Sequence, residues 1–372
     1  MSDQTESSAS AGSCDKQIPR CDDFIRLLLQ WNQPLPGRGL PWVSQSDPYI
    51  VWVSEIMLQQ TRAETVIPYF ERFMRELPNL QSLAAASNDQ VMKLWSGLGY
   101  YTRARNLHAC AKIICSDHHG IFPQKFEEIL SLPGIGRSTA GAICALAFAM
   151  RTPILDGNAK RVYSRHFAID DEPLSKRNRI LWQIADAHTP ANNTQKYTQR
   201  IMDLGATVCL PKNPKCTACP LAGSCAAKAL AQVERFPIKV PSKHRPTVSV
   251  TMIVAFDQSG NFLVQKRPDS GIWGGLWSFP EFTGNTDTLT NWMREHYGAD
   301  VQLAQPGAVF HHHFTHYRLA IVPQPVSILA LANRFHRRSD VKLIHSDSRS
   351  DWGIPAPVIT LINRYSHHSF EH

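Results

Sequence analysis

The chain has 372 residues and a formal net charge of +8, with 39 Lys and Arg against 31 Asp and Glu. This length is enough for two or more domains and excludes a single small module. The positive charge favours an anionic partner but does not distinguish DNA from RNA or a membrane surface. The sequence has no apolar run of the roughly 18 to 20 residues that cross a bilayer, so we expect no membrane-spanning segment and no membrane partner.

The N-terminal segment, residues 1–20, is rich in Ser, Asp and Gln and offers few side chains to bury. We expect it to be a disordered lead. It has neither the apolar core of a secretory signal nor the basic bias of an organelle transit peptide. We therefore expect a soluble protein in the cytoplasm of a bacterial-type cell, associated with the nucleoid.

Residues 21–228 have a helical pattern. Apolar side chains recur at spacings of three and four, as in Phe24, Leu27, Leu28 and Trp31, and short Gly and Pro breaks separate the periodic stretches. We expect these residues to form an all-α domain.

The helix that carries Glu55 is almost wholly apolar. Asp47 followed by Pro48 is a typical start, and Glu55 is the one charged residue among residues 49–58. Apolar neighbours would disfavour the ionised carboxylate and raise its pKa, as a general acid near neutral pH requires. Helix geometry equally allows Glu55 to lie on a solvent-facing stripe with Ser54 and Gln59.

A glycine turn joins two helical stretches within residues 126–146. Gly134 and Gly136 bracket one apolar residue, which permits a tight turn. Backbone N–H groups of this turn and of the next helix could hold a phosphate oxygen without a charged side chain. The glycine spacing alone also fits an ordinary helical hairpin.

A second candidate carboxylate, Asp156, lies where a turn enters another helix. Asp156 or Asn158 would cap that helix, and the helix dipole and N–H donors favour an ionised carboxylate. We expect Asp156 to stay negative at neutral pH. Most aspartates in this position are caps alone. A protonated carboxyl paired with a carboxylate is, however, what cleavage of a glycosidic bond requires.

Nine cysteines are present, and four of them crowd into seventeen residues: Cys209, Cys216, Cys219 and Cys225. This clustering argues for metal ligation over disulfides. Four thiolates could bind zinc or an iron-sulfur cluster, and the chemistry alone does not choose between them.

The pattern changes after the cysteines. Residues 229–247 contain three prolines among Lys and Arg and predict an extended linker. Val248–Phe256 and Asn261–Gln265 are typical strands joined by a turn at Asp257–Gly260. We expect a second domain, of α+β type, over residues 248–372.

Four strings in order resemble the adenine DNA glycosylase family, within the endonuclease III superfamily of helix-hairpin-helix enzymes. They are SEIMLQQT at 54–61, GLGYYTRARNLH at 97–108, LPGIGRSTAGA at 132–142 and ILDGNAKRV at 154–162. With the cysteine loop and the C-terminal domain, the resemblance runs from about residue 22 almost to the end of the chain. It implies a multidomain enzyme: an all-α helix-hairpin-helix glycosylase domain with an iron-sulfur cluster loop, then an α+β Nudix-like domain.

The resemblance implies roles for individual residues. Glu55 would protonate N7 of adenine, Asp156 would stabilise the cationic sugar and Asn158 would order the site. The adenine pocket would be formed by Arg38, Trp42, Leu58 and Gln199. The wedges inserted into the duplex beside the lesion would be Gln60, Leu98 and Tyr100. Such wedges are needed because a stacked adenine is unreachable until it is flipped out. Each apolar residue among them could instead belong to the core.

The same resemblance implies functions for the glycine turn and for the four clustered cysteines. Gly134, Gly136 and Ser138 would contact a DNA phosphate, and the four cysteines would hold a 4Fe-4S cluster. Superfamily members that cleave the strand carry a lysine where this chain has Ser138. The implied enzyme is therefore monofunctional and leaves an abasic site.

The C-terminal domain resembles the Nudix-like domain that this family uses to recognise 8-oxoguanine. Phe314, Thr315 and His316 match the lesion loop, with Thr in place of the family's Ser. Between Thr283 and Asp300 the only glutamate is Glu295, so the metal-binding carboxylates of a Nudix hydrolase are missing. The domain should bind and not hydrolyse. The neighbouring histidines 311–313 would alternate between strand faces, which argues against a metal site.

The implied partner is double-stranded DNA with an 8-oxoguanine:A or G:A mispair, and we expect a monomer. Two other functions stay open. One is a pyrimidine or thymine-mismatch glycosylase of the same superfamily, and the other is a non-catalytic DNA-damage binding protein.

Overall fold

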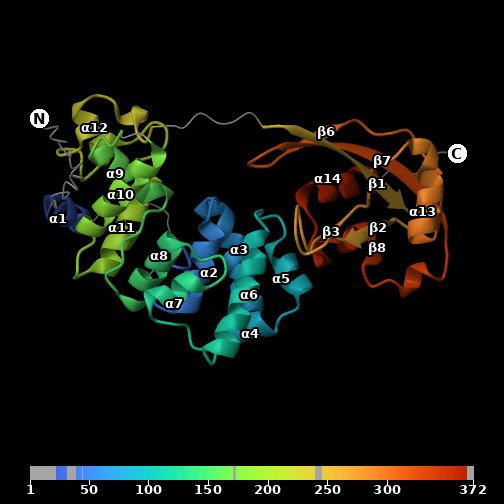
Figure 1. The fold of residues 1–372 in the computed structure, drawn as a ribbon, viewed down its shortest axis with the longest axis horizontal. Coiled ribbons are helices and arrows are strands. Elements are labelled where there is room, and N and C mark those ends of the chain that lie inside the picture. Colours follow the sequence, from blue (N-terminus) through green and yellow to red (C-terminus); the bar gives the residue numbers. More distant parts are fainter. Residues whose placement is uncertain (1–21, 32–38, 44, 171–172, 239–244, 367–372) are drawn as a thin grey trace, which may run out of the picture. The chain divides into compact units, whose positions relative to one another are not determined.

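The computed structural model describes residues 22–31, 39–43, 45–170, 173–238 and 245–366 (Figure 1). The predicted disordered lead and the pocket candidate Arg38 lie outside these residues. The contacts divide the chain into two compact units: a first unit of residues 1–38 and 137–239, and a second unit of residues 39–136 and 240–372. The predicted domain boundaries differ from this division and stay predictions.

The first unit is helical. Its α-helices are α1 (Asp22–Gln30), α8 (Arg137–Phe148), α9 (Gly157–His166), α10 (Leu174–His188), α11 (Thr194–Thr207) and α12 (Ala226–Ala229). Small residues let α8 approach its neighbours closely. A Cβ on Gly141 would lie 2.4 Å from the Pro153 carbonyl oxygen, which leaves no room for a side chain. Glycine is therefore required where α8 passes the segment that leads to Asp156.

The helical part of the second unit precedes the hairpin turn. It consists of α2 (Pro48–Leu58), α3 (Ala63–Glu76), α4 (Leu80–Ala85), α5 (Asn88–Trp95), α6 (Thr102–Asp117) and α7 (Phe126–Ser131). Asp47 caps α2 as predicted, because its Oδ1 accepts a hydrogen bond of 2.8 Å from the Tyr49 N–H. Aromatic rings fill the core of this part, including Trp52, which packs edge-on against Phe122.

The rest of the second unit is built on a mixed sheet. Its strands are β1 (Thr247–Phe256), β2 (Asn261–Lys266), β3 (Trp277–Ser278), β4 (Glu281–Phe282), β5 (Ala299–Leu303), β6 (Phe310–His313), β7 (Arg318–Leu331) and β8 (Val341–His345). The main strand order is β3-β2-β1-β7-β5, with β1 and β7 parallel and in register from Thr247 opposite Arg318. The predicted first two strands and the turn between them are confirmed.

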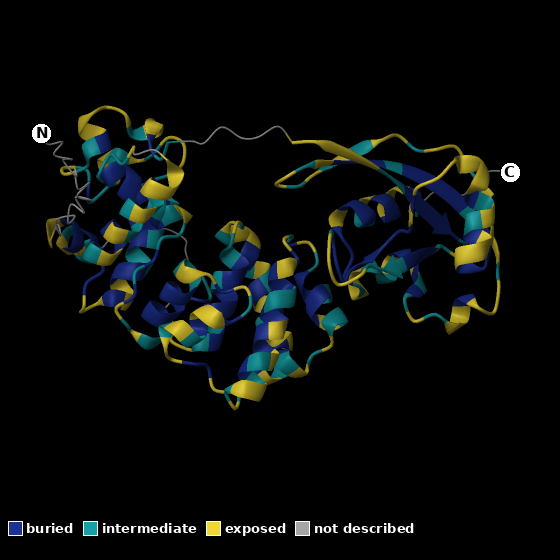
Figure 2. Ribbon diagram, viewed as in Figure 1, coloured by how far each residue is buried: buried dark blue, intermediate teal, exposed yellow. Residues whose placement is uncertain are grey.

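Two helices complete the C-terminal domain, α13 (Leu289–Tyr297) and α14 (Ala356–Tyr365). Leu289 and Met293 of α13 share one buried cluster with Ile253 of β1 and Val326 of β7. Figure 2 shows the buried residues as a dark blue band along the central strands. The predicted α+β class of this domain is confirmed.

The predicted linker is only partly extended. Ala229 ends α12, residues Val233–Arg235 form a 3-10 turn, and Phe236 is buried. The Phe236 carbonyl accepts a hydrogen bond of 3.0 Å from Nε of Arg165. The prolines of this segment predicted an extended chain, but Phe236 is buried in the first unit. No helix among the described residues is long and apolar enough to cross a membrane.

Candidate active site

Glu55 lies on α2, in the second unit. Every residue of α2 is buried or half-buried, and Glu55 itself is half-buried. Ser54 is only 2% exposed, and its hydroxyl donates to the Val51 carbonyl at 2.8 Å. The solvent-facing stripe that sequence left as an alternative for Glu55 is therefore wrong, since Ser54 faces the interior.

Asp156 lies in the first unit and is the N-cap of α9. One carboxylate oxygen accepts a hydrogen bond of 2.7 Å from the Ala159 N–H, as the sequence predicted for Asp156 or Asn158. An N-cap has its side chain at the positive end of the helix dipole, where an anion is stabilised. The carboxylate is thus fixed in orientation by the helix that follows it.

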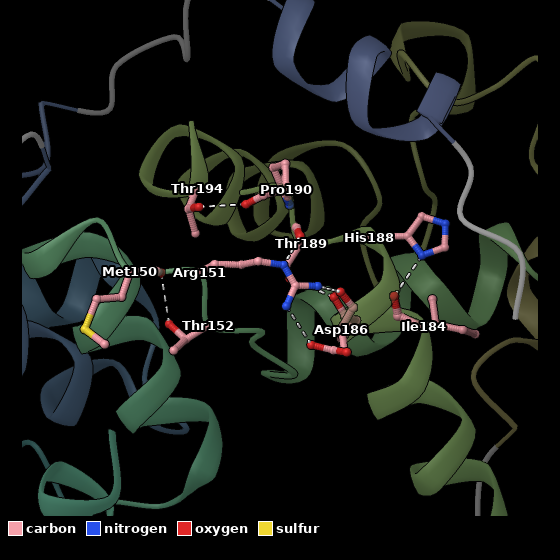
Figure 3. Close-up of polar contacts among 10 residues, drawn as sticks. Met150, Arg151, Thr152, Ile184, Asp186, His188, Thr189, Pro190 and Thr194 are labelled. Atoms are coloured by element: carbon pink, nitrogen blue, oxygen red, sulfur yellow. Dashed lines mark hydrogen bonds and ion pairs between the residues drawn. The ribbon is translucent and has the colours of Figure 1, made fainter. Parts of the chain in front are cut away.

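Hydrogen bonds hold the segment that leads into Asp156 (Figure 3). Arg151 donates from Nε to the Thr189 carbonyl at 3.0 Å and from Nη2 to the Asp186 carbonyl at 2.6 Å, at the C-terminal end of α10. The hydroxyl of Thr152 donates to the Gly141 carbonyl of α8 at 2.9 Å. The approach to Asp156 is therefore tied to two helices.

The side chain of Ser138 binds Leu155, the residue before Asp156. Its Oγ accepts a hydrogen bond of 3.1 Å from the Leu155 N–H. This contact gives Ser138 a structural task within the first unit, beside the predicted phosphate contact.

Asn158 and Arg161 complete the surroundings of Asp156. Arg161 donates to Asn158 Oδ1 at 2.9 Å, to the Gly205 carbonyl of α11 at 2.6 Å and to the Cys209 carbonyl at 2.6 Å. One guanidinium therefore links the helix that carries Asp156, its neighbouring helix and the start of the cysteine loop.

Burial raises the pKa of Asp156 above its ordinary value. The N–H groups of Ala159 and Asn158 and the charge of Arg161 act in the opposite direction, but they do not outweigh desolvation. The direction of the shift is therefore opposite to the one that the donors and the helix dipole predict by themselves. The expectation that Asp156 stays negative at neutral pH remains a prediction, and the sequence argument for it counted only the donors and the helix dipole.

The glycine turn has the predicted form. Gly134 and Gly136 are exposed on either side of the buried Ile135, and Ile135 N–H donates to the Leu132 carbonyl at 3.2 Å. Gly134 has φ +78°, and a Cβ there would lie 2.7 Å from Cβ of Asn106. Only glycine meets both demands. The exposed backbone of the turn is accessible to a phosphate, and that contact stays a prediction.

Three predicted wedge residues lie in two loops of the second unit. Gln60 follows α2, while Leu98 and Tyr100 precede α6. Gln60 and Tyr100 both have left-handed backbones, with φ of +56° and +50°, which is uncommon outside glycine. Tyr100 is 47% exposed, whereas Leu98 is 6% exposed and contributes to the core.

The predicted pocket residues are distributed over both units. Trp42 is buried against Phe70, with ring centroids 5.2 Å apart, and Leu58 is half-buried at the end of α2. Gln199 lies in the first unit, on α11, where its amide donates to Asp203 at 3.2 Å. Their roles toward adenine stay predictions.

The four clustered cysteines line one cavity in the first unit, together with Arg165, His166 and apolar side chains. All four are free and half-buried. Arg165 donates to Sγ of Cys209 at 3.3 Å and to the Leu210 carbonyl at 2.7 Å. Burial raises the pKa of Cys219 to about 11, so its thiol is protonated at neutral pH unless a cation binds.

Each of the four cysteines could supply one thiolate to a metal centre in this cavity. Within the described ranges, no three His, Cys, Asp or Glu side chains converge on a point where one ion could bind. A four-iron cluster takes one thiolate for each iron, so its four sulfurs surround a volume and need not converge. Four cysteines around one cavity match that requirement.

The predicted lesion loop is the turn of the β6–β7 hairpin. Phe314 N–H donates to the Tyr317 carbonyl at 2.9 Å and closes this turn. The Phe314 ring is half-buried among aromatic rings, 4.8 Å from Tyr317 and 5.6 Å from Trp273 between centroids. Thr315 and His316 are exposed at the tip. The tip residues are thus accessible, while the Phe314 ring packs against its aromatic neighbours.

Sequence reasoning missed the arginines that organise these sites. Arg103, Arg161 and Arg165 are at least half-buried and donate mainly to backbone carbonyls. Arg103 and Arg161 lie inside strings that carried the family resemblance. Their side chains were given no role because a sequence does not show which carbonyls a buried arginine reaches.

Two family models match the chain. The model described as HhH-GPD superfamily base excision DNA repair protein matches residues 53–187, and the NUDIX domain model matches residues 251–364. The fold and the two matches define a helix-hairpin-helix base excision repair protein with a C-terminal Nudix domain, as the resemblance implied.

Curated relatives narrow the class. Adenine DNA glycosylase of Buchnera aphidicola from Acyrthosiphon pisum is 36% identical over 93% of this chain and 99% of its own length. That of Buchnera aphidicola from Schizaphis graminum is 37% identical over 90% of this chain and 96% of its own length. The chain therefore belongs to the adenine DNA glycosylase family.

A solved structure supports the fold of the helical part. The structure of a thermostable thymine-DNA glycosylase is similar with a TM-score of 0.51 and 28% identity. The match covers 56% of this chain and 96% of that one.

Proposed function

We propose that this chain hydrolyses the N-glycosidic bond of adenine mispaired with 8-oxoguanine or guanine in double-stranded DNA. Membership of the adenine DNA glycosylase family supports the reaction and the base. The structural observation that carries the proposal is Asp156, a carboxylate held by the N-terminus of α9 and tethered by the segment before it. Such a fixed anion can stabilise a cationic sugar.

The proposed chemistry divides between two carboxyl groups. Glu55 transfers a proton to N7 of adenine, which makes the base a neutral leaving group when the bond to the sugar breaks. Asp156 stabilises the oxocarbenium-like sugar that remains, and Asn158 orders the site around it. Water then adds to the sugar carbon, loses a proton and leaves an abasic site.

A single-turnover assay tests this function. Duplexes with 8-oxoguanine:A, G:A and G:T pairs are incubated with excess protein, and released bases are measured before and after alkali treatment. We expect adenine release from the first two and strand breaks only after alkali. Release of thymine alone would favour the function named for the thermostable structural relative, and binding without any release would favour a non-catalytic binder.

We further propose that Cys209, Cys216, Cys219 and Cys225 hold a 4Fe-4S cluster, which would fix the loop between Cys209 and Cys225 when bound. Support comes from the cavity that these cysteines line. Protein purified without oxygen should absorb visible light and contain iron and sulfide in equal amounts. Cys219→Ser should lose both signals, whereas Cys115→Ser, outside the cluster, should keep them. A colourless protein that contains zinc would contradict the cluster.

Recognition of 8-oxoguanine is the proposed task of the Phe314, Thr315 and His316 loop. His316 is exposed at the tip of the turn, so His316→Ala should leave the fold intact. We expect it to reduce the preference for 8-oxoguanine:A over G:A by about tenfold, the size typical of one lost base contact. His313→Ala, on the same hairpin, is the control. Equal preferences in wild type and His316→Ala would remove His316 from recognition.

The proposal includes a monomer that acts in the cytoplasm of a bacterial-type cell, on nucleoid DNA. The monomeric state and the cytoplasmic location are supported by the sequence alone. Light scattering after size-exclusion chromatography tests the monomer directly.

A further inference from the structure

Arg103 makes several hydrogen bonds within the second unit. It lies in the first turn of α6 and is 8% exposed. Its guanidinium contacts two loops that are far apart in the sequence, the loop after α2 and the loop before α6. These are the loops that carry Gln60, Leu98 and Tyr100.

One nitrogen of Arg103 closes the end of α2. Nη1 donates to the carbonyls of Ile56 at 2.9 Å, Met57 at 2.8 Å and Gln59 at 2.6 Å. Carbonyls at a helix C-terminus lack partners within the helix and carry partial negative charge, so a guanidinium satisfies both needs. The backbone immediately before Gln60 is thereby fixed.

The other terminal nitrogen bridges the two loops, since Gly99 lies in the loop before α6 and Thr61 in the loop after α2. Nη2 donates to the Gly99 carbonyl at 3.1 Å and the Thr61 hydroxyl at 3.2 Å. The guanidinium also lies 5.4 Å from the centroid of the Tyr100 ring. A single planar group therefore sets the spacing between the two loops.

Gln60 and Tyr100 need such support because their left-handed backbones are unfavourable for side chains larger than glycine. Residues in this conformation persist where the surrounding structure over-determines them, often at functional sites. Lysine could not replace the arginine, because one ammonium group cannot span both loops. Burial lowers the pKa of Arg103 to about 10, which still leaves it charged at neutral pH.

We propose that Arg103 is a positioning residue that couples the Gln60 loop to the Tyr100 loop, so that both enter the duplex together and expel the target adenine. This inference rests on the proposed function, in which these loops insert beside the mispair. Arg103 itself does not touch the reacting atoms. A purely structural arginine would affect stability and leave extrusion of the base unchanged.

The test measures base extrusion separately from chemistry. The probe is an 8-oxoguanine:A duplex with a non-hydrolysable 2′-fluoro adenosine as target and 2-aminopurine beside it, whose fluorescence rises when the stack opens. Arg103→Lys should show a smaller rise than wild type at saturating protein. On the hydrolysable duplex its single-turnover rate should fall about tenfold or more, because small misplacements are costly in catalysis.

Arg72→Lys is the matched control. Arg72 also donates to a backbone carbonyl, that of Leu94 at 2.9 Å, and lies over the Tyr69 ring, but it contacts neither loop. We expect its fluorescence rise to equal that of wild type even where its thermal stability falls. Thr61→Val removes one acceptor of Arg103 and should give a weaker effect in the same direction.

Three outcomes separate the claims. A wild-type fluorescence rise in both Arg103→Lys and Thr61→Val would overturn the role of Arg103 and leave the proposed function intact. If Arg103→Lys does not fold, an unchanged rise in Thr61→Val is sufficient to overturn it. Failure of the wild-type protein to release adenine would remove the proposed function itself, and this inference with it.

Discussion

Glu55→Gln should lower the single-turnover rate of adenine release by about 100-fold or more, within the range for loss of a general acid. Glutamine has nearly the same shape and still fits the half-buried position on α2, but it has no proton to donate to the base. Binding to the same mispaired duplex should change little, because the missing proton transfer matters in the transition state. Rates from rapid-quench sampling and affinities from fluorescence anisotropy measure the two effects separately.

The control for this substitution is Glu71→Gln. Glu71 is an exposed carboxylate on α3 of the same unit, so its loss changes the net charge equally without affecting α2. It should keep the wild-type rate. Unchanged kinetics in Glu55→Gln would exclude Glu55 from the mechanism and remove the acid from the proposed pair.

Asp156→Asn should also reduce the rate of adenine release by about 100-fold or more, the size typical of losing one electrostatic stabiliser. Asparagine can still accept the hydrogen bond from the Ala159 N–H, so α9 should remain capped. What is lost is the negative charge opposite the sugar. The measurement is the same single-turnover assay, made at several pH values.

The pH dependence follows from the raised pKa of Asp156. As the pH falls, this carboxylate takes up a proton at a higher pH than an ordinary aspartate does. Wild-type activity should therefore begin to decline at a higher pH than it would with an aspartate of ordinary pKa. The ionised carboxylate of Asp156 lowers the stability of the folded state, because the folded state binds the proton more tightly than the unfolded state does. The melting temperature of Asp156→Asn at neutral pH should therefore equal or exceed that of wild type.

Asp47→Asn is a control of the same chemistry. Asp47 is also an N-cap aspartate, on α2, and its side chain is exposed. The substitution removes one charge and keeps one cap, as in Asp156→Asn, but at the start of α2, about two helical turns before Glu55. Should both variants lose the same activity, the effect of Asp156→Asn would be one of capping or net charge and not of catalysis.

The local elements of the fold could be predicted from the sequence because each has a local cause. Asp47 and Pro48 start α2, the glycines at 134 and 136 make the hairpin turn, and the residues of β1 and β2 flank a turn closed by Asp257. The linker was predicted less well. Its prolines are visible in the sequence, whereas the hydrogen bond that the Phe236 carbonyl accepts comes from Arg165, 71 positions earlier in the chain.

The position of Asp156 at a helix N-terminus was predicted, but the effect of burial on its pKa was not. Asp156 was placed at a helix N-terminus correctly, yet the direction of its pKa shift depends on protein that surrounds it from other helices. Arg103 and Arg161 were overlooked for the same reason. The role of a buried arginine depends on the carbonyls that it contacts. These come from segments far apart in the sequence, so residue spacing does not reveal them.

Gly205 packs closely against the start of α9, beside Asp156, the proposed stabiliser of the sugar cation. A Cβ at this position of α11 would come within 2.5 Å of the Asn158 Cβ and 2.8 Å of its Cα, so the two helices touch backbone to backbone. The first turn of α9 therefore has no space to move closer to α11. If Asp156 acts as proposed, its carboxylate is positioned by the packing of α9 on α11 before DNA binds.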